Sequence, residues 1–207
     1  MGISIHYRGR LDDVGQLGIL CEELADIAGA MGWESVRLDD DWEQPVNARL
    51  RGTPSGAHID GNLGLKGISI TGAGAESLSF FFDREGNLRC PVSMVLILEG
   101  TLDPEDAWVS VKTQFASPEV HVWVVGLLKY LKKRYISDLQ VSDEGEYWET
   151  GDIRILRDKM DFINRKIEQI AGGLSSSRFG DVSGLSAEEI ASRIEQFLRD
   201  TLEGNQG

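Results

Sequence analysis

Two short acidic stretches carry the side chains of this chain that are best suited to chemistry. Residues 141–152, VSDEGEYWETGD, hold five carboxylates around a Tyr and a Trp, with no Lys or Arg among them. Residues 38–43, LDDDWE, repeat the combination of Asp, Trp and Glu. Carboxylates that converge in space bind divalent cations or basic partners. The candidate acidic patch consists of Asp39, Asp40, Asp41, Glu144, Glu146 and Glu149.

The stretch 141–152 also fits a structural turn between a strand and a helix. In that interpretation Thr150 or Asp152 caps the helix, while Tyr147 and Trp148 fold onto the core. A calcium loop needs alternating oxygen ligands and a Gly at its sharp turn, and neither acidic stretch has that twelve-residue pattern. We therefore predict no metal and no cofactor, and the choice between turn and patch stays open.

The chain has three histidines, His6, His58 and His121, and none is close in sequence to another as in a metal site. They can still meet an acid in space. The alternative function is therefore a hydrolase-like enzyme in which the acids at 39–43 and 143–149 approach a His in a cleft. The sequence has no nucleophile-elbow, Walker-type or dinucleotide motif, so the catalytic residues are unknown.

A second candidate surface comes from two segments with strand-like alternation. In ISIHYRG (3–9) and WVSVKTQF (108–115), apolar and polar residues alternate, so one face of a sheet is packed and the other is polar. The polar face is either simply solvated or a platform for a ligand or protein, which exposed Trp108 or Phe81 would extend. Its basic members would form a cationic area on an acidic protein. The candidate binding face consists of His6, Arg8, Arg89, Ser110, Lys112 and Gln114.

Composition narrows the class of protein. The 207 residues include 21 basic and 34 acidic side chains, and the net charge of −13 disfavours nucleic acid as a partner. With 41% hydrophobic residues but no apolar run of membrane-spanning length, the chain is expected to be globular and not a membrane protein. We expect a cytoplasmic location because no export signal is evident. Cys21 and Cys90 lack metal or redox spacing and are expected to be buried thiols.

Hydrophobic periodicity predicts an α+β fold. We expect a mostly antiparallel sheet of about six or seven strands with helices packed on one face, in the order β-α-β-β-β-β-β-α-β-α-α. Residues 43–64 are expected to form a long irregular loop. The strands are predicted at 3–9, 35–39, 65–72, 77–82, 88–98, 108–115 and 138–142, and the helices at 13–31, 117–136 and 152–171.

The chain is expected to form one domain, residues 1–171, followed by a flexible Gly/Ser linker at 172–184. A C-terminal accessory helix at 185–203 begins with the capping box SAEE at 186–189. This helix either docks on its own core or pairs with a second copy as a homodimer.

The segments ISIHYRG, WVSVKTQFASPEVH and VSDEGEYWETGD resemble a family of uncharacterised bacterial proteins over roughly residues 1–170. The resemblance implies a bacterial, intracellular protein and carries over no catalytic residue. The element order is also similar to that of TATA-box-binding-protein-like folds, in which helices back a curved antiparallel sheet; this likeness does not fix function. The leading hypothesis is a non-enzymatic binding or protein-interaction module that uses the polar sheet face.

Overall fold

The computed structural model describes residues 2–54, 56–72, 74–175, 186 and 189. Contacts within the chain form two compact units, Met1–Arg157 and Asp158–Gly207, and each is treated by itself. Most of the predicted linker and accessory helix lie outside the described residues. The capping box is confirmed, because the backbone N–H of Ser186 donates to the Glu189 carboxylate at 2.8 Å and the Glu189 N–H donates to the Ser186 hydroxyl at 3.2 Å.

Most of the predicted strands and helices are present, and most strands are shorter than predicted, whereas β2 begins one residue earlier. The strands are β1 (Ser4–Arg8), β2 (Glu34–Asp39), β3 (Arg49–Thr53), β4 (Gly56–Asp60), β5 (Lys66–Thr71), β6 (Leu78–Phe82), β7 (Leu88–Arg89), β8 (Val109–Lys112) and β9 (Gln140–Asp143). The α-helices are α1 (Leu17–Met31), α2 (Pro91–Leu98), α3 (Pro118–Arg134), α4 (Tyr147–Thr150) and α5 (Ile153–Ser175), and the 3-10 turns are η1 (Val14–Gln16) and η2 (Pro104–Asp106).

The α+β class is confirmed, but the strands form three antiparallel sheets and not one. A three-stranded sheet has the order β8-β1-β9, a four-stranded sheet has the order β2-β5-β6-β7, and β3-β4 is a separate hairpin. The first two sheets are joined where Arg10 bridges Asn87, next to the ends of β1 and β7. The hydroxyl of Tyr7 adds a second link, because it donates to the Ser79 carbonyl and accepts from the Ser79 N–H.

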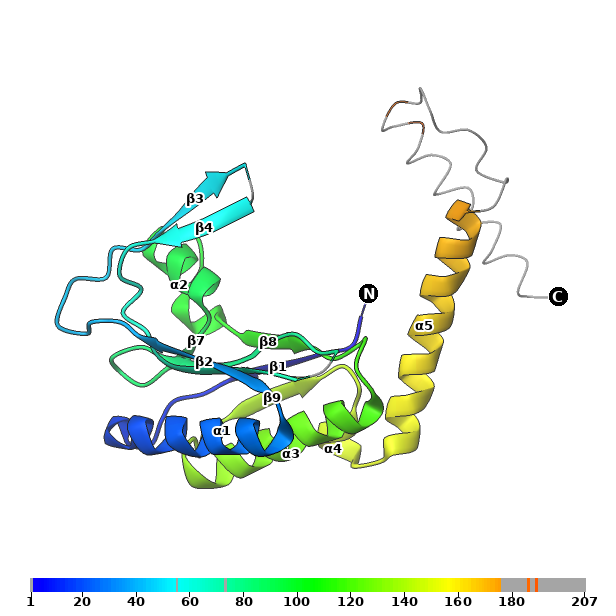
Figure 1. Ribbon diagram of the computed structural model, residues 1–207, viewed down its shortest axis with the longest axis horizontal. Helices are drawn as coiled ribbons and strands as arrows, with labels where there is room; N and C mark the ends of the chain where they lie inside the picture. The colour runs from blue at the N-terminus through cyan, green and yellow to red at the C-terminus, as the bar shows by residue number, and fades with distance from the viewer. Residues whose placement is uncertain (1, 55, 73, 176–185, 187–188, 190–207) are drawn as a thin grey trace. The chain divides into compact units, whose positions relative to one another are not determined.

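One core underlies both sheets on the side where α1 and α3 lie (Figure 1). Burial of these side chains is the main source of stability. The core contains Ile5 and Tyr7 of β1, Ile68 and Ile70 of β5, Phe80 and Phe82 of β6, Val109 and Val111 of β8, Leu20 and Leu24 of α1, and Leu128 and Leu131 of α3.

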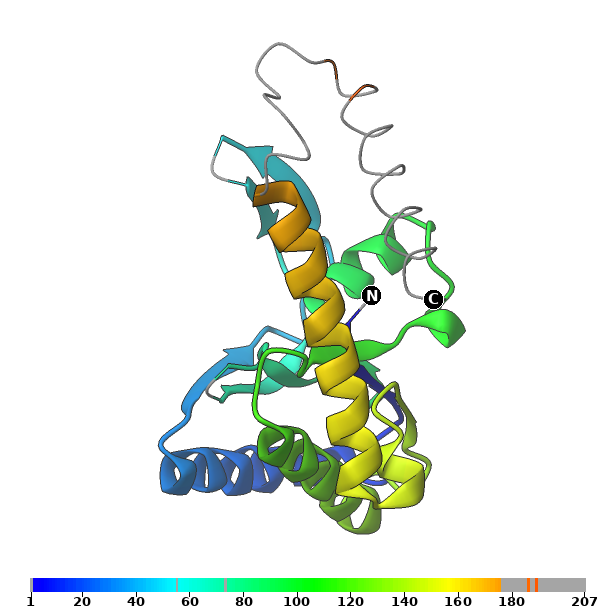
Figure 2. The same ribbon diagram turned by 90° about the vertical axis from the view of Figure 1, so that its right-hand side faces the viewer.

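The strand predicted at 88–98 is wrong beyond Arg89, because Pro91–Leu98 is helix α2. An apolar run of this length fits a buried strand or a buried helix equally well by periodicity. The helix is favoured by its start, where Pro91 fills the first turn and Cys90 and Ser93 cap each other's backbone N–H groups. Helix α2 packs on the face of the four-stranded sheet opposite α1 and α3, with Val95 beside Phe81 (Figure 2). The predicted helices α1 and α3 share one face, and α2, which was not predicted, covers the other.

The irregular loop predicted at 43–64 contains the hairpin β3-β4. Arg49, Arg51 and His58 share one face of this hairpin, and Leu50 pairs with Ile59 on the other. Its residues are mostly exposed, which removes the apolar–polar alternation that would have marked the strands.

Helix α5 extends to Ser175, four residues beyond the predicted end at 171. None of the helices described is of a length and hydropathy that would cross a membrane.

Candidate ligand-binding groove

The three-stranded sheet has the polar face that alternation predicts. His6 of β1 lies opposite Ser110 of β8 and Ser142 of β9, and Ser4 lies opposite Lys112. Directly opposed residues point to the same face of a sheet, and residues two apart along a strand do so as well. His6, Arg8, Ser110 and Lys112 are therefore on one face, where Ser110 is exposed and the other three are half-buried.

Two residues proposed for this face lie elsewhere. Strand β8 ends at Lys112, so alternation does not continue to Gln114, which is 1% exposed in the following turn. Its side-chain oxygen accepts the Ile3 N–H at 2.9 Å, which closes the end of the sheet. Phe81 is buried against Val95 on the other sheet. Trp108 does lie on the polar face, beneath Arg8.

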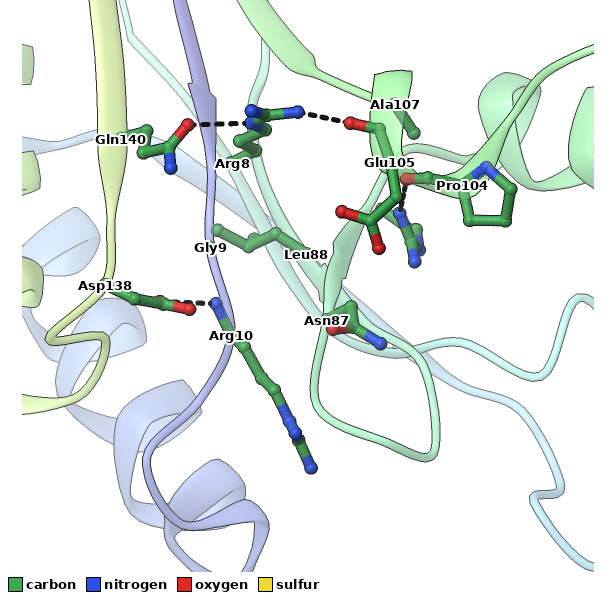
Figure 3. Close-up of a pocket in the computed structure, with 11 residues that line it drawn as sticks. Arg8, Gly9, Arg10, Asn87, Leu88, Pro104, Glu105, Ala107, Asp138 and Gln140 are labelled. Carbon is green, nitrogen blue, oxygen red and sulfur yellow. Dashed lines mark hydrogen bonds between the residues drawn. The ribbon is translucent and has the colours of Figure 1, made fainter.

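A cavity of about 270 Å³ opens where the polar face meets β7. Its walls come from β1, β7, β9 and the η2 turn, which are far apart in the sequence. The lining residues are Arg8, Gly9, Arg10, Asn87, Leu88, Arg89, Pro104, Glu105, Ala107, Asp138 and Gln140. We call this cavity the Arg8 groove (Figure 3).

The guanidinium of Arg8 is fixed on three sides by uncharged groups. Its Nε donates to the side-chain oxygen of Gln140 at 2.9 Å, and its Nη1 donates to the backbone carbonyl of Glu105. Its Cζ lies 4.5 Å from the centre of the Trp108 ring, in a cation–π contact. Figure 3 shows Arg8 between Gln140 and Glu105. These contacts therefore fix the position of the Arg8 guanidinium, but none of them neutralises its positive charge.

Arg89 and Arg10 differ from Arg8 in their partners. Arg89 donates to the Asp83 carboxylate at 3.1 Å, and both side chains are nearly buried, so this pair is neutral as a unit. The Nη1 of Arg89 also donates to the Pro104 carbonyl at 2.7 Å. Arg10 donates from Nε to the Glu85 carbonyl at 2.8 Å, and its side chain extends away from the other lining residues (Figure 3).

Two carboxylates also line the groove. Asp138 accepts the backbone N–H of Arg10 at 2.9 Å. Glu105 is exposed, and its carboxylate turns toward the cavity while its backbone carbonyl holds Arg8 (Figure 3). The groove thus has a rigid cationic group on one wall and a solvated acid on the other.

A buried chain of hydrogen bonds lies on the opposite face of the same sheet. The Thr113 hydroxyl is 2.7 Å from Nδ1 of His121, and Nε2 of His121 is 3.1 Å from the Asp143 carboxylate. Thr113 and His121 are fully buried, and Asp143 is 7% exposed. Asp143 also accepts the backbone N–H groups of Gly145 at 2.7 Å and Trp148 at 2.9 Å. The alternative hypothesis placed an acid of 143–149 beside a His, and Asp143 does contact His121, although the contact is buried and not in a cleft. Sequence reasoning did not identify Thr113 as a member of this group.

Burial by itself raises the pKa of Asp143, since a charged carboxylate loses water. The hydrogen bond and charge of His121 and the N–H groups of Trp148 and Gly145 outweigh this effect. The pKa of Asp143 therefore lies below its ordinary value of 3.8.

The candidate acidic patch is divided between two sheets. Asp39 pairs with Lys66 at 2.6 Å, while Asp40 and Asp41 accept nearby backbone N–H groups and shape the loop after β2. Glu144 accepts the Ser4 N–H at 2.7 Å beside β1. Within the described part of the chain, no three His, Cys, Asp or Glu side chains are placed to hold a metal ion.

The stretch 141–152 forms the turn that one interpretation predicted. It carries the chain from β9 through the short helix α4 into α5, and Tyr147 and Trp148 pack against the core. Glu146 adopts a left-handed conformation with φ of 59°, and Glu149 lies exposed on α4. The other three carboxylates are Asp143 and Glu144, described above, and Asp152. Asp152 caps α5 through the Arg154 N–H, and contact with Arg154 lowers the pKa of its carboxyl to about 2.

The chain matches no protein-family model, and comparison with curated proteins and with solved structures gives no match. The resemblance inferred from the three sequence segments stays a prediction. Function must therefore be argued from the geometry of the chain itself.

Sequence reasoning identified Arg8 and Arg89 but not the rest of the groove. Gln140 follows from strand alternation on β9, because it pairs with Arg8 in register. Asn87, Glu105 and Asp138 lie in turns, where no periodicity marks a residue as part of a surface.

Proposed function

We propose that this protein is a non-enzymatic binding protein whose ligand site is the Arg8 groove at the end of the polar sheet face. The observation that carries the proposal is the convergence of Arg8, Arg89 and Gln140, from three strands, on one polar cavity. Ligand sites are concave and have a few fixed polar groups, and a volume near 270 Å³ suits a small molecule. Both cysteines are free, which fits a reducing compartment, and on this ground we also propose a cytoplasmic location.

A thermal-shift screen of small polar metabolites against the full chain tests this proposal, after a native mass spectrum has shown whether any molecule is retained on purification. A ligand at 100 times its Kd stabilises the folded state by about 2.7 kcal/mol, which raises Tm by several degrees. We expect at least one compound to do so, and the shift to be lost in Arg8→Gln.

Arg37→Gln is the matched control for this screen. Arg37 is an exposed Arg on β2, at the edge of the four-stranded sheet away from β7. Its substitution by Gln removes the same charge as Arg8→Gln does. A compound that stabilises the Arg8→Gln protein as strongly as the native chain, or a screen without any stabilising compound, contradicts the proposal.

The alternative function is a hydrolase, and the order hydroxyl–imidazole–carboxylate in Thr113, His121 and Asp143 favours it. In such a mechanism His121 accepts the hydroxyl proton and Asp143 orients the imidazole. The burial of Thr113 argues against it, because a nucleophile must reach its substrate. Turnover of p-nitrophenyl acetate that disappears in Thr113→Val would establish the hydrolase, and we expect no turnover above background in either protein.

A further inference from the structure

We infer that the Arg8 groove takes a small ligand through an anionic group, a carboxylate or a phosphate, held by the guanidinium of Arg8. This inference rests on the proposed function and names the chemistry of its ligand. The hydrogen-bond partners of the Arg8 side chain are uncharged, and they leave its positive charge uncompensated.

A guanidinium that is partly removed from water loses hydration, and hydrogen bonds to neutral groups restore only part of it. Arg8 is half-buried, and its acceptors are an amide oxygen and a backbone carbonyl. These two bonds use Nε and one N–H of Nη1. Among residues 2–54, 56–72 and 74–157, the remaining N–H groups of Arg8 have no hydrogen-bond acceptor. An anionic ligand would supply both the missing acceptors and the counter-charge.

The position of Arg8 is set before any ligand arrives. Trp108 supports one face of the guanidinium, and Gln140 and Glu105 hold its edge. A planar guanidinium that is already held in position loses little conformational entropy when it binds a carboxylate or phosphate. The second cation of the groove, Arg89, is already paired with Asp83, so it shapes the wall and adds little net charge.

The net charge of −13 does not exclude an anion at this site. At physiological ionic strength, exposed charges more than about 8 Å away are largely screened, so the nearest charges decide. Among these, the Asp138 and Glu105 carboxylates oppose an anion, and both are exposed. Asp138 already accepts the backbone N–H of Arg10, and the carboxylate that turns toward the cavity is that of Glu105. Removing its charge should therefore strengthen the binding of an anion and weaken the binding of a cation.

Calorimetric titration of the full chain at constant ionic strength tests the inference. The probes are sodium phosphate, sodium succinate and the dication putrescine, and the proteins are the native chain, Arg8→Gln, Arg8→Lys and Glu105→Gln. We expect at least one of the two anions to bind the native chain. Its affinity should fall about tenfold or more in Arg8→Gln and less in Arg8→Lys, and should rise about threefold in Glu105→Gln. The anion that binds tells the carboxylate source from the phosphate source.

Circular dichroism shows whether Arg8→Gln is folded, and Glu105→Gln gives an independent result, because Glu105 is exposed. A third outcome is that neither anion binds and that putrescine binds the native chain but not Glu105→Gln. This result would overturn the inference of an anionic ligand and leave the proposed binding function standing. Absence of heat from both anions and from putrescine overturns the inference. Affinities that do not change in any variant overturn both the inference and the proposed function.

Discussion

Thr113, His121 and Asp143 are the residues through which the three-stranded sheet is fastened to α3 and α4. Thr113 follows β8 and its N–H donates to the Ile3 carbonyl, His121 lies in the first turns of α3, and Asp143 ends β9. Among the residues that the structure describes, each buried side-chain nitrogen and oxygen has a hydrogen-bond partner. The hydrogen bonds of Thr113, His121 and Asp143 are therefore satisfied, and they specify how these elements meet. The full burial of these three side chains indicates a structural role that supports the polar face from behind.

Asp143→Asn should destabilise the folded protein by about 2–4 kcal/mol at pH 7, because an amide cannot accept from all three donors that Asp143 serves. The folded pKa of Asp143 is below 3.8, so its stabilising contribution is complete above pH 3.8 and is lost as the pH falls through the lower folded value. Urea unfolding at pH 7 and pH 3 measures both effects.

The difference in unfolding free energy between native and Asp143→Asn proteins should shrink at the lower pH. Asp152→Asn is the surface comparison: its carboxyl also has a lowered pKa, but its arginine partner is exposed, so its effect at pH 7 should be much smaller than that of Asp143→Asn. If the two proteins differ in unfolding free energy by the same amount at both pH values, Asp143 is not the ionised partner of His121.

Element-scale packing is tested by two glycines in different surroundings. Gly67 in β5 has φ of +149°, and a Cβ there would lie 2.0 Å from the Phe80 carbonyl oxygen. Gly126 in α3 is exposed, and nothing lies within 4 Å of a Cβ placed on it. Gly67→Ala should cost on the order of 3 kcal/mol, while Gly126→Ala should stabilise the helix by about 0.5–1 kcal/mol.

Thermal unfolding of the two glycine variants gives the comparison directly, because both add the same methyl group. The account predicts Tm shifts of opposite sign. A Gly67→Ala protein as stable as the native one would mean that β5 and β6 are not as close as described.

The elements that sequence predicted well are those with one buried and one solvated face. β1, β5, α1 and α3 all have this asymmetry, so period two or period 3.6 is visible in their residues. Helix α2 and hairpin β3-β4 were missed because the first is apolar on all sides and the second is exposed on both. The face of the groove was predictable from alternation around Arg8, but its depth was not. That depth depends on turns that bring Glu105 and Asp138 to the end of β1.

At the scale of the whole molecule, the unit 1–157 combines a packed side and a proposed binding side in one sheet. The apolar side of β8-β1-β9 packs against helices, and the polar side ends at a cavity with an oriented, uncompensated arginine. In the proposed function, the net charge of −13 disfavours anions at the surface in general, and Arg8 provides the local positive charge that binds one in the groove. This arrangement is the basis of the proposed binding function, and homodimerisation through residues 185–203 stays a prediction from the sequence.

The most direct test of the central claim is a map of amide chemical shifts as sodium phosphate or sodium succinate is added to the isotope-labelled full chain. The account predicts that the largest changes occur at Arg8, Gly9, Asn87, Arg89 and Gln140, and that they saturate. Shifts that saturate elsewhere, for example on the Arg-bearing hairpin β3-β4, or that never saturate at the groove, would contradict it.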